Sequence, residues 1–355
     1  MQPVIDWLRG KMANTDQMMM LASLVVIFAL LILVGDILAP LIVAIALAYV
    51  MGSVVDMLER FGLPRLLCIA AVGIGALCMV LFLLLAVIPL LTEQIGRLIM
   101  QVPELVSDFR ALLHTLQVNY ASWIKPEYVQ QLIVATAGKL QGWGGELFSF
   151  SLASIPGLIT LMIYVVLVPV LVFFMLKDKF QLIAWAQSFL PRERTLLNQV
   201  GNEVDVQIGN YIRGKVWETL IVGAASWLGL WIFGHEYALL LGALTGISVW
   251  IPFVGIALVA VPVVLLSLFQ WGWSDVTAYA LITYAVIQAL DANVLVPWLF
   301  SEVVNLHPIA IIVAILVFGS LWGLVGVFIA IPMAALVQSV LKVLMQSDKA
   351  QVETE

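Results

Sequence analysis

Between Lys215 and Lys342 the chain contains 126 residues without a Lys or an Arg, and most of these residues are apolar. Asp291 lies inside this tract, in the apolar stretch 276–297. A charged Asp in the middle of a membrane helix costs roughly 2.5 to 3.5 kcal/mol on insertion scales, so chains keep one mainly where a proton, a cation or a polar path uses it. The tract therefore predicts membrane helices that surround a functional carboxylate.

The neighbours of Asp291 favour a polar site at this point of the chain. Gln288 and Asn293 supply amide groups on either side of the carboxylate, and Pro297 follows as a helix breaker. We expect unwound backbone near Pro297, with carbonyl groups exposed to a cavity. Asp291, Asn293, Gln288 and these carbonyls are the candidate ligands of a proton or Na⁺. The alternative is a buried packing carboxylate bound to the backbone or to Arg213.

The composition places the chain among polytopic membrane proteins. Hydrophobic residues make up 63% and charged residues 11%, whereas soluble domains are about 45 to 50% apolar and near 25% charged. We expect an all-α integral membrane fold with about 7 to 8 membrane segments, re-entrant hairpins included, and amphipathic helices outside the membrane. Apolar stretches of about 20 residues, enough to cross ~30 Å of hydrocarbon, occur near 18–34, 38–55, 66–91, 155–176, 216–234 and 276–297.

Two further apolar stretches, 237–270 and 308–341, are too long for one straight span. A straight helix of about 34 residues would be ~50 Å long. We expect each stretch to turn back inside the membrane as a re-entrant hairpin; a kinked, tilted single helix or two short spans are the alternatives. The residues expected to break the helices are Pro252, Gly255, Gly319, Gly323 and Gly326.

The distribution of Lys and Arg predicts the orientation of the chain. Segment 177–215 carries six of these residues, whereas the longer segment 92–154 carries four. The first is therefore expected on the cytoplasmic side, together with both termini. The predicted organisation is a cytoplasmic N-terminus (1–17), three transmembrane helices (18–91), an extracytoplasmic amphipathic segment (92–154), a transmembrane helix (155–176), a cytoplasmic amphipathic helix (177–215), the C-terminal membrane region (216–341) and a cytoplasmic tail (342–355).

The predicted cytoplasmic helix brings polar side chains to the start of a membrane span. Gln207 and Asn210 lie on one face and Tyr211 on the apolar face, and Arg213 follows directly. These four residues are candidates for the transport path. Arg213 and Lys215 are interpreted as anchors of the helix at the membrane interface. The alternative is that Arg213 turns inward to pair with Asp291 or an anionic solute.

Several classes of function are excluded by composition and spacing. The net charge of −6 argues against a nucleic-acid partner. His114, His235 and His307 are far apart and lack HExxH-type spacing, and no GxxxxGK[ST] phosphate loop occurs. We therefore expect no catalytic residues, no metal site and no cofactor, which is not the pattern of an enzyme.

Five ordered stretches of the C-terminal half resemble the AI-2E family of bacterial membrane transporters, and the run 293–308 is most similar to its PerM-type permease branch. The resemblance implies an inner-membrane protein that forms a homo-oligomer, a pentamer. The matching stretches are 207–214 (QIGNYIRG), 251–255 (IPFVG), Gln288 with Asp291, Asn293 and Pro297, 306–308 (LHP) and 319–332 (GSLWGLVGVFIAIP).

The resemblance also implies transport, without one agreed substrate. One branch of the family is described as exporting autoinducer-2 and another as a Na⁺(Li⁺)/H⁺ antiporter. We expect a permease of the bacterial inner membrane that exports a small polar solute or exchanges H⁺ or Na⁺, with Asp291 as the candidate coupling carboxylate. The alternatives are a Na⁺(Li⁺)/H⁺ antiporter and a membrane scaffold that transports nothing.

Overall fold

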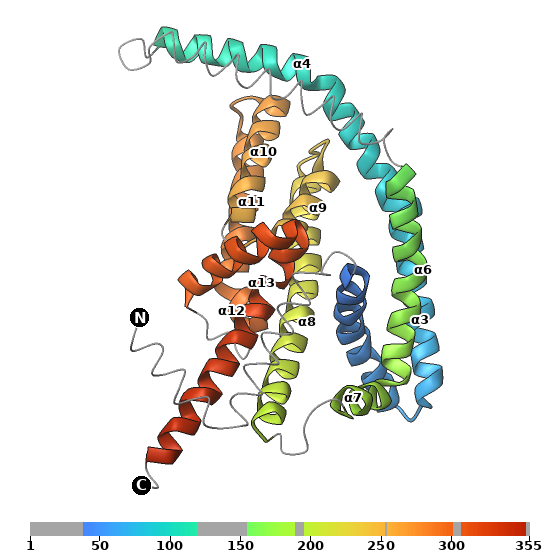
Figure 1. Cartoon of the computed structure of the whole chain (residues 1–355). Helices are drawn as coiled ribbons and strands as arrows, with labels where there is room; N and C mark the ends of the chain where they lie inside the picture. Colours follow the sequence, from blue (N-terminus) through green and yellow to red (C-terminus); the bar gives the residue numbers. More distant parts are fainter. Residues whose placement is uncertain (1–37, 120–154, 189–194, 253, 301–306, 353–355) are drawn as a thin grey trace.

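The computed structural model describes residues 38–119, 155–188, 195–252, 254–300 and 307–352 (Figure 1). These parts of the chain are helical and contain no β-strand, which confirms the predicted all-α fold. The predicted stretch 18–34 lies outside them. The helices are Leu38–Glu59, α3 (Arg65–Phe82), η1 (Leu83–Val87), α4 (Ile88–Asn119), α6 (Ile155–Lys177), α7 (Lys179–Ser188), α8 (Thr195–Ile232), α9 (Ala238–Ser248), α10 (Val254–Trp271), α11 (Asp275–Leu290), η2 (Asp291–Leu295), α12 (Val296–Phe300) and α13 (Pro308–Val352).

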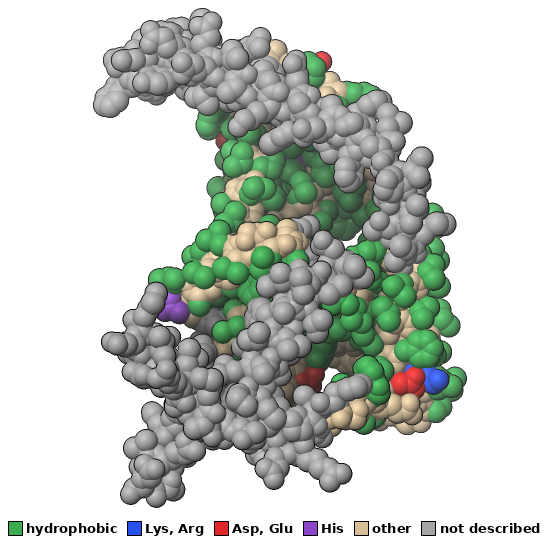
Figure 2. All heavy atoms as spheres, viewed as in Figure 1, with side chains coloured by type: hydrophobic (Ala, Val, Ile, Leu, Met, Phe, Trp, Pro, Cys, Tyr) green, Lys and Arg blue, Asp and Glu red, His purple; other side chains and the backbone are tan. Residues whose placement is uncertain are grey.

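Four of the described helices are long and apolar enough to cross a membrane: Leu38–Glu59, Arg65–Gln101, Val254–Trp271 and Asp275–Phe300. Their surfaces carry many exposed large apolar side chains, and apolar atoms cover most of the described face in Figure 2. A water-soluble protein rarely exposes apolar patches of this extent. The helical membrane protein predicted from composition is confirmed.

The first half of the described chain forms a helical layer that ends in a long arm. Helix Leu38–Glu59, α3 and α6 share a small core that includes Val55, Ile69 and Val172. The arm, α4, runs from α3 across the top of the molecule in Figure 1 and reaches the second half. There Gln94 Oε1 accepts a hydrogen bond of 2.8 Å from the backbone N–H of Leu240, near the start of α9.

Helix α8 is the central element of the second half and packs against α9, α11, α12 and α13. Its contact with α9 depends on glycines, because side chains would hold the two backbones apart. A Cβ at Gly246 would lie 2.7 Å from the carbonyl oxygen of Thr219, and a Cβ at Gly242 would lie 2.6 Å from Cβ of Trp227. This close approach fixes the position of α9 on α8.

The chain turns back between α9 and α10, at the break expected around Pro252. Leu241 of α9 and Val263 of α10 are buried in one apolar cluster. A Cβ at Gly255 would lie 1.9 Å from the carbonyl oxygen of Ser248, so only glycine fits where the two arms meet. The stretch 237–270 is therefore a helical hairpin, and its re-entry into the membrane stays a prediction.

Helix α13 contains a second reversal, at Trp322 and Gly323. Both residues have non-helical backbone angles, and Gly323 has φ of +56°, a value that favours glycine. Ala314 and Phe318 before the break pack against Ala330 after it. The stretch 308–341 thus consists of two arms as well, and their depth in a bilayer stays a prediction.

Candidate functional site

A π-helical turn sets the position of Asp291. Helix α11 passes directly into η2, whose first residue is Asp291, and α12 then continues the same rod. Pro297 lies inside α12 without ending it. The unwound backbone expected near Pro297 is therefore wrong: the chain shifts from α to π hydrogen bonding just before the proline. Such wide turns often occur at functional sites.

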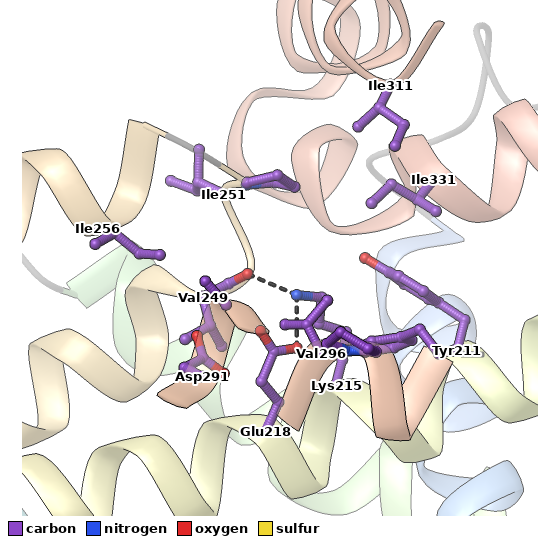
Figure 3. A pocket seen from close by; sticks show the side chains of 14 residues that line it. Tyr211, Lys215, Glu218, Val249, Ile251, Ile256, Asp291, Val296, Ile311 and Ile331 are labelled. Carbon is purple, nitrogen blue, oxygen red and sulfur yellow. Dashed lines mark hydrogen bonds and ion pairs between the residues drawn. The ribbon is translucent and has the colours of Figure 1, made fainter. Parts of the chain in front are cut away.

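Asp291 opens onto a cavity of about 600 Å³ between α8, the α9–α10 turn, α12 and α13 (Figure 3). Most of the lining side chains are apolar. The polar exceptions are Tyr211, Lys215, Glu218 and Asp291, and the first three come from α8 at intervals of four and three residues. One face of α8 therefore presents its charged groups to the carboxylate of η2.

Lys215 and Glu218 form a buried ion pair in this cavity. The Lys215 Nζ lies 2.7 Å from Glu218 Oε2, and the two side chains are 7% and 3% exposed. The same ammonium donates a hydrogen bond of 2.8 Å to the carbonyl oxygen of Val249 in the α9–α10 turn, and it lies 5.2 Å from the centre of the Phe300 ring. A buried ion pair is stable only when further hydrogen bonds complete its surroundings. Lys215 meets that condition.

Asp291 is buried to a similar degree but is less well satisfied. It is 3% exposed, and its Oδ1 has no hydrogen-bond partner among the described residues. Lys215 and Glu218 both act on it electrostatically. Two carboxylates and one ammonium give the ionised cavity a net charge of −1. A group of charge +1 would neutralise it.

Arg213 lies away from Asp291. Its Nη1 donates to Ser53 Oγ at 2.9 Å and its Nη2 to Asn210 Oδ1 at 2.6 Å. Arg213 lines a second cavity of about 450 Å³, together with Tyr49, whose hydroxyl donates to Asp205. Residues two apart on an α-helix point about 200° away from each other. The basic residue near Asp291 is therefore Lys215, and Arg213 faces the opposite side of α8.

The other candidate residues divide between the cavity and its surroundings. Tyr211 lines the cavity, and its hydroxyl has no partner among the described residues. Gln288 has a buried amide without a described partner, one turn before Asp291. Asn293 is exposed and bonds back to Ala289 O at 2.8 Å. Gln207 bonds to Glu203 at 3.3 Å and does not line the cavity.

Sequence reasoning missed Lys215 as a site residue and missed Glu218 altogether. The bias of Lys and Arg toward the cytoplasmic side led to the interpretation of Lys215 as an interface anchor. The available signal was the spacing of Tyr211, Lys215 and Glu218, which places all three on one helical face at the beginning of an apolar span. Lys215 and Glu218 at i and i+3 also form a standard helical ion pair.

The family model described as "AI-2E family transporter" matches residues 21–346, which is most of the chain. The chain belongs to the AI-2E transporter family. It is 38% identical over 341 residues to the Escherichia coli K12 protein named "Putative permease PerM", covering 96% of this chain and 97% of that protein.

More distant relatives of this AI-2E family member have similar names. The "Putative transport protein YueF" of Bacillus subtilis is 28% identical, and the match covers 87% of this chain and 84% of that protein. The "Putative transport protein YhhT" of E. coli K12 is 25% identical over 93% of this chain and 90% of its own length. The family and the apolar helices together make the chain a multi-pass membrane protein of a transporter family.

Proposed function

We propose that this AI-2E family protein is a secondary transporter of the bacterial inner membrane, with both termini in the cytoplasm. It exports a small polar solute or exchanges ions, and each cycle includes the binding of one monovalent cation, H⁺ or Na⁺, at Asp291. The observation behind this proposal is a buried carboxylate whose Oδ1 has no hydrogen-bond partner in the described parts of the chain, next to a Lys–Glu ion pair at 2.7 Å. Ionisable groups in membrane interiors usually belong to ion or proton pathways.

The charge of the cavity supports one cation rather than two. Lys215 already balances one of the two carboxylates at 2.7 Å. The remaining charge of −1 is costly in a medium of low dielectric constant, and one bound proton or Na⁺ removes this cost. The apolar lining leaves room for a solute of small size next to the charged groups.

The two hairpins support a transport cycle in which the site changes its access. The cavity is lined by Val249, Ile251 and Pro252 from the α9–α10 turn and by Ile311 and Ile331 from both arms of α13. Broken helices that meet at a binding site are a common device of secondary transporters. Movement of either hairpin would open the cavity on one side.

The test is proton flux in proteoliposomes that contain purified protein and an internal pH-sensitive dye. Gradients of Na⁺, Li⁺ and a panel of small polar solutes are imposed in turn. We expect at least one gradient to drive proton movement, and Asp291→Asn to abolish it while the protein still folds. Asp275→Asn is the matched control, because Asp275 is an exposed residue at the other end of the same helical rod.

The outcomes separate this proposal from its alternatives. Proton movement driven by Na⁺ or Li⁺ alone would identify a Na⁺(Li⁺)/H⁺ antiporter, while a requirement for a solute would identify coupled export. Coupled flux that survives Asp291→Asn would refute the role of the carboxylate. A scaffold without transport predicts no flux for any gradient. The homopentamer implied by the resemblance remains a prediction, which the mass of the purified oligomer would test.

A further inference from the structure

We infer that a hydrated path for water and protons leads from Asp291 along the α8–α11 interface toward the α8–α9 turn. We call the side chains that line it the polar seam: Asp291, Gln288, Ser226, Tyr284 and Thr245. Only the role of this path, which is to bring protons to Asp291 from one side of the membrane, rests on the proposed function. The hydration of the polar seam is a separate claim with its own test.

The first observation is a set of buried polar atoms that have no hydrogen-bond partner within the part of the chain that the structure describes. Among the described residues, no hydrogen bond reaches Ser226 Oγ, either amide atom of Gln288 or Oδ1 of Asp291. Buried polar groups of native proteins are nearly always paired, with protein or with ordered water. A single unpaired buried polar atom has many explanations, but several of them at one helix interface indicate that water molecules are their hydrogen-bond partners.

The second observation is that these atoms lie at neighbouring levels. A Cβ at Gly229 of α8 would lie 3.0 Å from Ile287 Cδ1 and 3.2 Å from Thr283 Cγ2, which fixes the register of α8 against α11. Ser226 is one turn from Gly229 on α8, and Gln288 follows Ile287 directly. The two helices run in opposite directions, so Ser226 and Gln288 reach the same level. Asp291 lies one turn further along, at the cavity.

The third observation is the behaviour of comparable hydroxyl groups in the same region. Ser267 is fully buried and donates to the carbonyl oxygen of Val263 at 2.7 Å, and Thr245 donates to that of Leu241 at 2.7 Å. These bonds to the preceding turn are the usual solution for a hydroxyl in an apolar helix. Ser226 has the same option in α8 and does not use it. Its hydroxyl is therefore available to water in the polar seam.

The end of the polar seam nearest the α8–α9 turn is closed in this conformation. Tyr284 lies beside Thr245, one turn beyond Gln288, and its hydroxyl has no hydrogen-bond partner among the described residues. Beyond them, Leu230, Leu241 and Ala280 pack in the same cluster as Tyr284, and these three apolar side chains are at most 1% exposed. The path thus extends from Asp291 to this cluster, which acts as the barrier toward the α8–α9 turn. Hydroxyl and amide groups suit water and protons, whereas a larger solute would need the wider cavity.

The test is hydroxyl-radical labelling of the membrane-embedded protein, which modifies aromatic side chains that lie next to water. Tyr284 is 6% exposed, so a dry interface would protect it. We expect Tyr284 to be labelled in the wild type, and labelling to fall at least threefold in the double variant Ser226→Ala/Gln288→Met. Ser267→Ala is the control: it removes a buried hydroxyl outside the polar seam and should leave Tyr284 labelling unchanged.

Three results would overturn the inference. The first is a wild-type Tyr284 that is protected, and the second is a label that persists in the double variant. The third is a double variant with a higher melting temperature, because removal of dry, unpaired polar groups stabilises a protein whereas removal of hydrated ones does not. The two proposals have separate tests. Coupled proton flux in Asp291→Asn tests the proposed function, and the label on Tyr284 reports hydration of the polar seam whether or not coupling is found.

Discussion

The charge of the cavity can be changed in steps, and the steps predict a specific order of stabilities. Lys215→Met removes the ammonium and leaves Glu218 and Asp291 as two buried carboxylates without a counter-charge. Breaking a buried pair by removal of one partner costs about 3 to 5 kcal/mol. The lost hydrogen bond to Val249 O, 2.8 Å in the wild type, adds about 1 kcal/mol. Lys215→Met should therefore be among the most destabilising changes in α8.

Removing the second partner should restore most of that loss. The double variant Lys215→Met/Glu218→Gln has again one carboxylate and a net charge of −1. Replacement of a whole buried ion pair by uncharged groups is often neutral or stabilising. We expect the double variant to lie within about 2 kcal/mol of the wild type, so the two substitutions should interact by roughly 2 to 4 kcal/mol.

The single variant Glu218→Gln separates an effect on folding stability from an effect on cation coupling. It leaves Lys215 with Asp291, so the cavity is neutral without a bound cation. We expect a modest loss of stability, because the ammonium retains a carboxylate nearby, together with loss of the cation requirement. The double variant should keep the requirement for one cation, because its charge equals that of the wild type.

The assay is thermal unfolding in detergent, followed by the fluorescence of the 12 Trp residues over a range of pH. Acid should selectively rescue Lys215→Met, because a proton bound by the folded cavity replaces the missing positive charge. One additional proton in the folded state raises stability by up to about 1.4 kcal/mol per pH unit as the pH falls. A Lys215→Met variant as stable as the wild type, or a double variant as damaged as Lys215→Met, would refute the charge count.

Three further predictions test other parts of the structure. Burial lowers the pKa of His235, at the α8–α9 turn, to about 4, so the unfolded chain binds more protons than the folded one between about pH 4 and 6.5. The free energy of unfolding should therefore fall by up to roughly 3 kcal/mol as the pH drops through this window. His235→Asn keeps an acceptor for the N–H of Tyr237 and should remove this pH dependence of unfolding. The control His307→Asn, at an exposed position, should leave the pH dependence unchanged. Gly255→Ala should cost about 3 kcal/mol or more in the same assay, because its Cβ would lie 1.9 Å from a carbonyl oxygen; Gly201→Ala, with open space around it, should gain up to about 1 kcal/mol. Arg213→Gln should leave the cation requirement of proteoliposome flux intact, since Arg213 bonds Ser53 and Asn210 on the other side of α8; loss of that requirement would place Arg213 in the site.

Much of the fold could be predicted from the sequence because the bilayer restricts the solutions. Long apolar stretches must become helices when no water is present to satisfy the backbone. The stretch 276–297 corresponds closely to the span Asp275–Phe300. Composition could not predict that the helix continues through Pro297. A proline is compatible with a kink, a break or a π turn, and which of these forms depends on packing against α8.

The candidate site was predictable in part, and the missing part has a physical cause. An Asp inside an apolar stretch is visible in any sequence, since its cost is local. Its partners are not visible, because Lys215 and Glu218 reach it from another helix, through tertiary packing. Arg213 and Lys215 are equivalent in composition and differ only in helical phase, so the spacing of Lys215 and Glu218 becomes decisive only once the rotation of α8 is known.

Lys215 links the charge of the site to the position of a hairpin. Its ammonium balances Glu218 and also holds the α9–α10 turn through Val249 O. The next residue of that turn, Trp250, donates from Nε1 to Thr219 Oγ1 at 2.8 Å and packs edge-on against Phe328 in the second arm of α13. A change in the charge around Lys215 therefore acts on one hairpin directly and on the other through one aromatic contact. A cation bound at Asp291 weakens the electrostatic attraction between that carboxylate and the Lys215 ammonium, so the ammonium binds Glu218 and Val249 O more firmly. Occupancy of the site then favours the position of the α9–α10 turn seen in this structure.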